Sequence, residues 1–406
     1  MYNVRKIAED TWYVGVTDNR IHLFENIHPL PEGVTYNSYV ILDEKTALMD
    51  TVDWNFVPQF MENVEHVLDG RDLDYVVINH LEPDHASGLA EVLLRYPEAT
   101  FVMSEKGAQF ARQFGFDIDN YKLQTVKEGD TLELGKHTLA FVEAPMVHWP
   151  EVIVTLDLHT GVLYSADAFG TFGKLDGRLF DDEVDFEGEF LDHARRYFTN
   201  IVGKYGKPTE ALLKKAEPLL DKIKMFAPLH GPVWRSNLSY YIDKHAKWAS
   251  YTPEEKGVLI VYGSMYGNTE EAAHIMASHL VQQGITQVKM YDASKTHHSY
   301  LIADTFKYSH LLVLSPTYNL TLYPPVKTYI EDMIMLNVQN RKVALVENGS
   351  WSPQAGKVMN EMFGKMRNME ILNDYVHIRS SVDEDKRQEL LALADVIVES
   401  VKETEL

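Results

Sequence analysis

Four side chains that can bind metal ions stand within six residues of one another. The stretch His80-Leu81-Glu82-Pro83-Asp84-His85 offers two imidazoles and two carboxylates, and it directly follows the apolar run 74–79. A run of that kind has the length of a buried strand, and loops at strand ends are where binding sites are commonly built. Three more candidate ligands each stand at or near the end of an apolar run: His148, Asp167 and His230.

The chemistry open to these seven residues is metal binding by nitrogen and oxygen. The chain has no cysteine, which excludes disulfides, zinc–cysteine sites, iron–sulfur clusters and a cysteine nucleophile. Mixed imidazole and carboxylate ligands suit non-haem iron. Two ferrous ions carry four positive charges, which three carboxylates and one bridging hydroxide would cancel. Two zinc ions carry the same charge, so the residues alone leave the metal open. The alternative, separate surface or capping roles, is disfavoured because all seven recur at strand ends in one predicted domain.

A second set of polar residues lies in three loops of the last 150 residues. The first loop joins a predicted strand to a helix, and its backbone N–H groups and hydroxyls can cradle a phosphate at the helix N-terminus. It lacks the lysine of a Walker A loop and has no Gly-x-Gly-x-x-Gly pattern. The three loops are Gly263-Ser264-Met265-Tyr266-Gly267-Asn268-Thr269, Ser315-Pro316-Thr317-Tyr318-Asn319 and Asn348-Gly349-Ser350-Trp351-Ser352. All of these residues except Gly263 and Ser352 are predicted to contact the ligand.

These loops follow the first, third and fourth strands of a regular strand–helix alternation. In a doubly wound parallel sheet of order 2-1-3-4-5 such loops gather at the switch point where a ligand binds. The arrangement resembles flavodoxin, which implies FMN, with either Tyr318 or Trp351 against the flavin face. The predicted strands are 258–262, 288–292, 311–315, 343–347 and 375–380, and the helices are 269–283, 325–336, 356–366 and 384–402.

The metal ligands belong to an earlier domain of mixed strands and helices. A polar break at 250–257 separates the two parts, so we predict domains at 1–250 and 251–406. In the first part we expect a hairpin of 35–42 and 45–50 and a second hairpin of 152–158 and 162–166. The remaining expected strands are 74–80 and 224–227, and the expected helices are 88–96, 190–202 and 209–222.

Composition narrows the class of protein. The formal net charge of the 406 residues is -22, from 60 acidic and 38 basic side chains, so nucleic-acid binding is disfavoured. No apolar run approaches the roughly 20 residues of a membrane helix. The N-terminus lacks the apolar stretch of a secretory signal. We therefore expect a cytoplasmic protein that binds neither nucleic acid nor membrane.

The first 250 residues resemble the metallo-β-lactamase superfamily, whose signature is His-x-His-x-Asp-His followed by distant His, Asp and His. Glu82 takes the place of the second histidine of that signature. A β-lactamase-like αββα sandwich with this glutamate, followed by a flavodoxin-like domain, resembles the flavodiiron protein family. The resemblance implies two irons with a bridging oxo or hydroxo group. It places one iron on His80, Glu82 and His148, the other on Asp84, His85 and His230, and Asp167 between them.

The same resemblance implies an oxidoreductase in which FMN feeds electrons to the iron pair. Such proteins reduce dioxygen to water or nitric oxide to nitrous oxide, with an external donor such as rubredoxin, a reduced deazaflavin or a flavoprotein reductase. They form head-to-tail homodimers or dimers of dimers. The choice of gas and of donor stays open here. Two rival classes are a zinc hydrolase with an attached flavodoxin, against which Glu82 argues, and a metal-free electron carrier, against which the complete ligand set argues.

Overall fold

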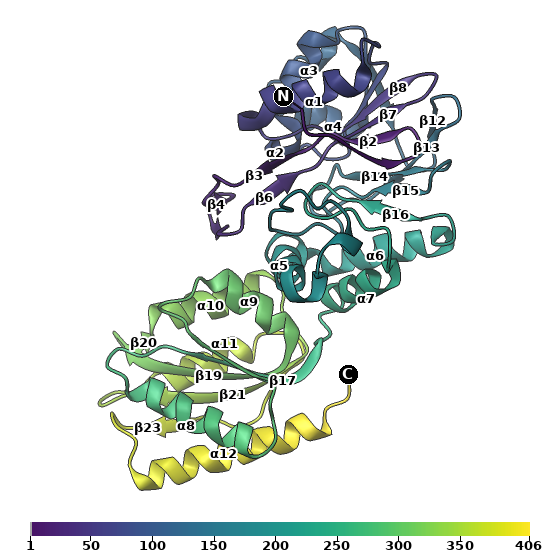
Figure 1. Cartoon of the computed structure of the whole chain (residues 1–406). Coiled ribbons are helices and arrows are strands. Elements are labelled where there is room, and N and C mark those ends of the chain that lie inside the picture. Colours follow the sequence, from purple (N-terminus) through teal and green to yellow (C-terminus); the bar gives the residue numbers. More distant parts are fainter. Residues whose placement is uncertain (1) are drawn as a thin grey trace. The chain divides into compact units, whose positions relative to one another are not determined.

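The computed structural model describes residues 2–406, which divide into two compact units. One unit comprises the residues up to Phe198 together with Lys207–Ala246, and the other comprises Thr199–Gly206 together with Lys247–Leu406. In Figure 1 the colour follows the sequence, from purple at the N-terminus to yellow at the C-terminus. The boundary predicted at 250/251 lies close to Lys247, and we keep 1–250 and 251–406 as the proposed domain limits.

The first unit is built from two sheets with helices on their outer faces (Figure 1), which confirms the predicted αββα sandwich. One sheet has the order β1 (Arg5–Ala8), β2 (Thr11–Tyr13), β7 (Tyr39–Leu42), β8 (Thr46–Met49), β9 (Tyr75–Val77), β10 (Thr100–Ser104), β11 (Lys122–Val126). The other has the order β12 (Thr131–Glu133), β13 (Thr138–Glu143), β14 (Ile153–Asp157), β15 (Val162–Tyr164), β16 (Met225–Ala227).

The helices of this unit follow from apolar spacing and from the crossovers that parallel strands require. In α1 (Val57–Leu68), for example, Phe60, Met61 and Val64 recur at helical spacing and are buried. The other helices are α2 (Pro83–Ala86), α3 (Leu89–Arg95), α4 (Glu105–Gln113), α5 (Leu191–Tyr197), α6 (Gly206–Ala216) and α7 (Leu238–Ala249). Two further strand pairs are β3 (Val16–Asp18) with β6 (Val34–Tyr36) and β4 (Leu23–Phe24) with β5 (His28–Pro29).

The predicted single strand 35–42 is wrong. It is two strands, β6 and β7, which belong to different sheets and are separated by Asn37 and Ser38. The Asn37 amide donates to the carbonyl oxygens of Pro228 and Gly231, both at 2.9 Å. These side-chain contacts replace the ladder bonds of a continuous strand. The hairpins β7–β8 and β14–β15 are antiparallel, as predicted.

Two predicted helices also differ in extent. The predicted helix 190–202 contains only one α-helix, α5, and π-helical turns lie on either side of it at Phe186–Phe190 and Phe198–Val202. The predicted helix 209–222 starts earlier, at Gly206; its α-helical part ends at Ala216 and a 3-10 turn at Glu217–Leu219 continues it. Sequence periodicity alone did not predict α1, α4 or α7.

The second unit is a parallel sheet with the order β18 (Val288–Asp292), β17 (Glu255–Tyr262), β19 (Tyr308–Tyr318), β21 (Arg341–Asn348), β22 (Met369–Ile371). This confirms the predicted order 2-1-3-4-5. The last position is shared with β23 (Val376–Ile378), which also pairs with β21, and β20 (Thr321–Leu322) pairs with β19. Strand β17 begins at Glu255, so the predicted linker 250–257 is too long at its C-terminal end.

Helices cover both faces of this sheet (Figure 1), and they bury strands such as β19, whose Leu311, Leu312 and Val313 are at most 1% exposed. This burial explains why the strands read as continuous apolar runs. The helices are α8 (Asn268–Gln282), α9 (His298–Lys307), α10 (Pro324–Met335), α11 (Ala355–Phe363) and α12 (Glu384–Glu403); α9 was not predicted.

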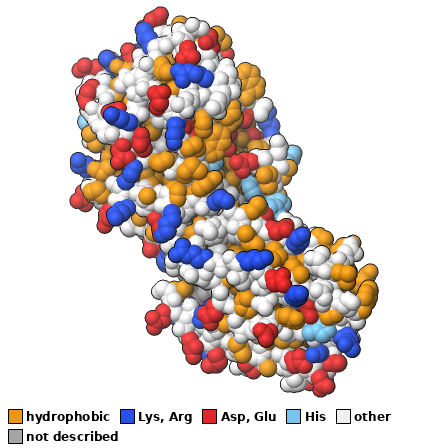
Figure 2. All heavy atoms as spheres, turned by 180° about the vertical axis from the view of Figure 1, so that it is seen from behind, with side chains coloured by type: hydrophobic (Ala, Val, Ile, Leu, Met, Phe, Trp, Pro, Cys, Tyr) orange, Lys and Arg blue, Asp and Glu red, His pale blue; other side chains and the backbone are white. Residues whose placement is uncertain are grey.

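The surface is charged and mixed. Figure 2 shows acidic and basic side chains interspersed with apolar ones over the visible face. Among residues 2–406 no helix has the length and apolar character that a membrane span needs.

One buried cation joins several segments of the second unit. Arg341 donates to the carbonyl oxygens of Thr305 and Phe306 at the end of α9, and to those of Tyr251 and Gln339. Burial lowers its pKa to about 9, which leaves the guanidinium charged at neutral pH. Its charge is therefore shared among carbonyl dipoles.

We predict that Arg341→Met destabilises the second unit by roughly 2–4 kcal/mol, because several buried carbonyls lose their donor. Urea unfolding, monitored through the release of bound FMN, measures this change in the free energy of unfolding. Lys342→Met is the matched control: that side chain is part-exposed and its loss is expected to cost at most about 0.5 kcal/mol. Equal destabilisation by the two substitutions would contradict the stabilising role assigned to Arg341.

Candidate metal centre and flavin pocket

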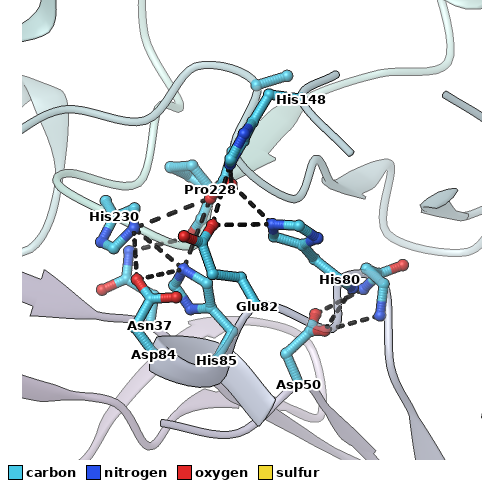
Figure 3. Close-up of polar contacts among 12 residues, drawn as sticks. Asn37, Asp50, His80, Glu82, Asp84, His85, His148, Pro228 and His230 are labelled. Carbon is cyan, nitrogen blue, oxygen red and sulfur yellow. Dashed lines mark hydrogen bonds and ion pairs between the residues drawn. The ribbon is translucent and has the colours of Figure 1, made fainter. Parts of the chain in front are cut away.

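All seven predicted metal ligands come together in the first unit. They form two clusters that can each hold a metal ion, and Figure 3 shows Glu82 turned toward His80 and His148, with Asp84 beside His85 and His230. We call His80, Glu82 and His148 cluster A, and Asp84, His85 and His230 cluster B; Asp167 lies between the two clusters.

Cluster A is compact. The Nε2 atoms of His80 and His148 lie 3.2 and 3.0 Å from Oε2 of Glu82. The same two nitrogens lie 3.2 and 3.1 Å from Oδ2 of Asp167. Two imidazole nitrogens and two carboxylate oxygens thus face one point.

Cluster B repeats this pattern with other residues. Oδ2 of Asp84 lies 3.2 Å from Nε2 of His85 and 3.3 Å from Nε2 of His230. The other oxygen of Asp167, Oδ1, lies 3.5 and 3.8 Å from the same two nitrogens. Asp167 therefore turns one oxygen to each cluster, which is the geometry of a bridging carboxylate.

The buried oxygens fit a pair of cations. Asp84 and Asp167 each have two oxygens that are buried and have no hydrogen-bond donor among the described residues. A buried carboxylate without a donor is costly, and a bound cation would remove that cost. Two cations of charge +2 suit the three carboxylates of the centre, as argued from the sequence.

The pKa shifts show how strong the local field is. Burial alone would lower the pKa of His85, but Asp84 and Asp167 raise it to about 10. Burial likewise opposes the rise of the His148 pKa, which Asp167 and Glu82 bring to about 9. For Asp167, burial acts to raise the pKa, yet the neighbouring imidazoles hold it well below the usual range. The cluster thus has a negative potential that attracts cations.

Groups behind the ligands fix their orientation. The Nδ1–H of His80 donates to Oε1 of Glu151 at 2.7 Å, and the Nδ1–H of His230 donates to the Thr35 carbonyl at 2.7 Å. Each contact leaves Nε2 free to face the metal position. Asp50, at the end of β8, accepts from the backbone and side-chain N–H groups of Asn79, both at 2.7 Å, and thereby holds the start of the ligand loop.

Several site loops contain non-glycine residues in left-handed conformation. Asp50 has φ +55°, Met146 has φ +65° and Ala166 has φ +51°. Conformations of this kind cost of order 1 kcal/mol or more and persist where the surrounding structure holds them. Met146 and Ala166 precede the ligands His148 and Asp167 by two residues and one residue. Packing, rather than local preference, therefore places these ligands.

Three residues near the centre were missed in the sequence. Glu151 and Asp50 hold the ligand loop, and Tyr197 is buried with its ring 5.3 Å from that of His230. Burial, together with the charges of Asp167 and Glu82, raises the pKa of Tyr197 well above its usual value. Glu151 could have been suspected from its place three residues after His148. Nothing in the sequence around Tyr197 indicates its position.

The second unit has a cavity of 480 Å³ at the C-terminal edge of its sheet. Twelve of the fifteen predicted flavin residues line it. Gly267, Ser315 and Tyr318 do not: Gly267 has φ +96° at the turn into α8, and Ser315 is buried and accepts from Tyr323 N–H. The lining residues are Ser264, Met265, Tyr266, Asn268, Thr269, Pro316, Thr317, Asn319, Leu320, Asn348, Gly349, Ser350, Trp351 and Ser380, of which Leu320 and Ser380 were not predicted.

The cavity suits a phosphate that is held without basic side chains. None of its lining residues is Lys or Arg. Backbone N–H groups, hydroxyls and amides supply the donors, and the N-terminus of α8 adds its dipole. Trp351 lines the cavity and is 79% exposed, whereas Tyr318 packs edge-on against Tyr323. Trp351 is therefore the better placed of the two aromatic residues to cover a flavin.

Comparisons with known proteins agree with both sites. A family model described as ODP family beta lactamase matches residues 34–231, and the flavodoxin model matches 260–369. The nitric oxide reductase of Moorella thermoacetica is 32% identical over 357 residues, 87% of this chain and 88% of that protein. The anaerobic nitric oxide reductase flavorubredoxin of Vibrio vulnificus is 32% identical over 350 residues, 85% of this chain and 70% of that protein.

Two solved structures have the same overall fold. Rubredoxin oxygen:oxidoreductase from Desulfovibrio gigas matches with a TM-score of 0.91 and 28% identity, over 98% of this chain and 99% of that chain. A flavoprotein from Thermotoga maritima matches with a TM-score of 0.88 and 25% identity, over 99% of each chain.

A carboxylate–imidazole centre for two metals in a β-lactamase-like sandwich, followed by a flavodoxin-like unit, defines a flavin-linked di-metal oxidoreductase. The chain belongs to the flavodiiron protein family. This membership confirms the predicted class of enzyme and its predicted cofactors, FMN and two non-haem irons.

We predict that substitutions separate the two metal positions. Glu82→Ala removes a ligand of cluster A only, so the protein should retain about one iron, whereas Asp167→Ala removes the shared ligand and should lower the affinity for both, by about 100-fold or more. Iron per chain, measured by mass spectrometry after dialysis, tests this. Glu143→Ala, an exposed glutamate, is the control and should keep two irons. Equal iron loss in the Glu82 and Asp167 variants would contradict the bridge.

We predict that Trp351→Ala weakens FMN binding about tenfold through lost ring contact. Tyr318→Ala should leave the affinity within about twofold, because that ring does not line the cavity. Fluorescence titration of the FMN-free protein measures both values. The opposite ranking would show that Tyr318 covers the flavin.

Proposed function

We propose that this enzyme reduces dioxygen to water, nitric oxide to nitrous oxide, or both, at the centre formed by clusters A and B. The observation that carries the proposal is Asp167, whose two oxygens face the two clusters separately. When bound, the iron pair supplies electrons and open coordination positions, and FMN relays electrons from an external donor. The protein holds the two metal positions close together among largely buried side chains.

Tyr197 is proposed to serve this centre as a hydrogen-bond donor. Burial and the nearby carboxylates keep its hydroxyl protonated at neutral pH, since both raise its pKa. Reduction of either gas consumes protons, and a protonated phenol beside the metal ligands can orient oxygen atoms of the bound gas or donate to them. His80, His85, His148 and His230 act as metal ligands in this proposal.

Some relatives are named for nitric oxide and others for oxygen. The nitric oxide reductase of M. thermoacetica is 32% identical to this chain, and the oxygen oxidoreductase of D. gigas is 28% identical. Neither value singles out one gas, so both reactions are proposed. The test is anaerobic stopped-flow of the fully reduced protein mixed separately with O2 and NO, with product analysis. Flavin reoxidation that depends on iron, with water or N2O as product, supports the proposal. A purified protein with zinc alone that hydrolyses an ester or amide would overturn it.

The expected partners are an external electron donor and a second copy of the chain. Rubredoxin, a reduced deazaflavin or a flavoprotein reductase would each serve as donor. We propose a head-to-tail homodimer, alone or in a dimer of dimers, in which one subunit's FMN serves the other subunit's metals. The cytoplasmic location expected from the sequence stays a prediction.

Mixed dimers test this electron route directly. A mixed dimer pairs one Asp167→Ala chain, which lacks metals, with one Trp351→Ala chain, and it is assayed at an FMN concentration between the two dissociation constants, where the first chain holds FMN and the second is largely empty. A head-to-tail route predicts activity in the mixed dimer well above that of either variant alone. If electrons pass within one chain, the mixed dimer is no more active than the variants. Co-expression with two affinity tags isolates the mixed species.

A further inference from the structure

We propose that Glu151 makes the two halves of the metal centre electronically unequal and stabilises the ferric ion at cluster A. The inference rests on the iron site of the proposed function and assigns a positioning role to a residue outside the seven ligands.

Glu151 lies directly behind His80. Its carboxyl group is buried, and Oε1 accepts from Nδ1–H of His80 at 2.7 Å and from the Leu81 backbone N–H at 3.0 Å. Its second oxygen, Oε2, is buried and has no hydrogen-bond partner among the described residues. No salt bridge of the described residues joins Glu151 to a lysine or an arginine, so its negative charge acts mainly on His80.

Cluster B has no equivalent group. The Nδ1–H of His230 donates to the Thr35 carbonyl, which is neutral, and Nδ1 of His85 has no hydrogen-bond partner among the described residues. The two clusters have the same kinds of ligand, since each has two imidazoles, one terminal carboxylate and one oxygen of Asp167. Among the described residues, Glu151 therefore distinguishes cluster A as the one whose ligand imidazole donates to a carboxylate outside the seven ligands.

An imidazole that donates to a carboxylate gains imidazolate character and becomes a stronger donor to the metal. Stronger donation favours the higher oxidation state. With iron bound at both positions, the cluster A position would have the lower of the two reduction potentials. This second potential would be the one that depends on Glu151.

The test is a redox titration of the iron-loaded Glu151→Gln variant, in which EPR measures the amount of the half-reduced iron pair at each potential. Glutamine keeps the size and an acceptor oxygen but removes the charge. We expect the second potential to rise by at least the equivalent of a tenfold change in equilibrium constant, about 59 mV, and the first to move by less than half of that. Glu151→Asp should retain most of the wild-type separation between the two potentials.

Asp157→Asn is the matched control, because it removes a buried carboxylate that bonds the ring of His137, which is not one of the seven ligands. It should move neither potential by more than half of that amount. Equal shifts of the two reduction potentials in Glu151→Gln, or a shift of the first potential alone, would overturn the inference.

If the Glu151→Gln variant fails to fold or to hold iron, the proposal is tested on the wild-type protein. Spatially resolved anomalous dispersion on a half-reduced crystal should locate the ferric ion at cluster A. A ferric ion at cluster B would contradict the proposal. Iron content measured beforehand separates this failure from failure of the proposed function, since a protein without two irons fails the latter.

Discussion

The carboxylate of Asp167 is buried between two groups of imidazoles, and neither of its oxygens has a hydrogen-bond donor among the described residues. Burying such a charge without compensation is costly, and Glu82 and Asp84 add two more carboxylates within the same few ångströms. Two bound cations would compensate this charge. The left-handed loop residues of the first unit, such as Ala166, and the bonds of Asp50 to Asn79 hold the ligands in place while that charge is concentrated.

The second unit offers the phosphate of FMN a different kind of site, made of neutral donors and not of charged side chains. Its cavity has no basic side chain among the lining residues and offers neutral donors with a helix dipole. The cavity holds an organic cofactor by shape and many weak contacts, whereas the metal centre uses few strong ones. Trp351 lines this cavity and is exposed, so the cavity opens to solvent beside it. The buried centre suits a reaction in which intermediates must be kept from water.

Most of the candidate site could be read from the sequence because the candidate ligands sit in loops that follow strands. The stretch from His80 to His85 could be read as one site, and the β-lactamase resemblance supplied the partners. Glu151 and Tyr197 were missed because their roles depend on which loops meet in space. The break at Asn37 depends on amide contacts with Pro228 and Gly231, 191 and 194 residues away. The strands of the second sheet could be predicted because buried parallel strands have continuous apolar runs. Their order followed from the doubly wound arrangement that resembles flavodoxin.

The central claim is that one carboxylate, Asp167, joins two iron positions. Anomalous diffraction from crystals of the iron-loaded protein, collected on both sides of the iron absorption edge, tests it most directly. The account predicts two iron peaks, one bound by His80, Glu82 and His148 and the other by Asp84, His85 and His230, with one oxygen of Asp167 about 2 Å from each. A single peak, or two peaks of which one lacks Asp167, would contradict the account.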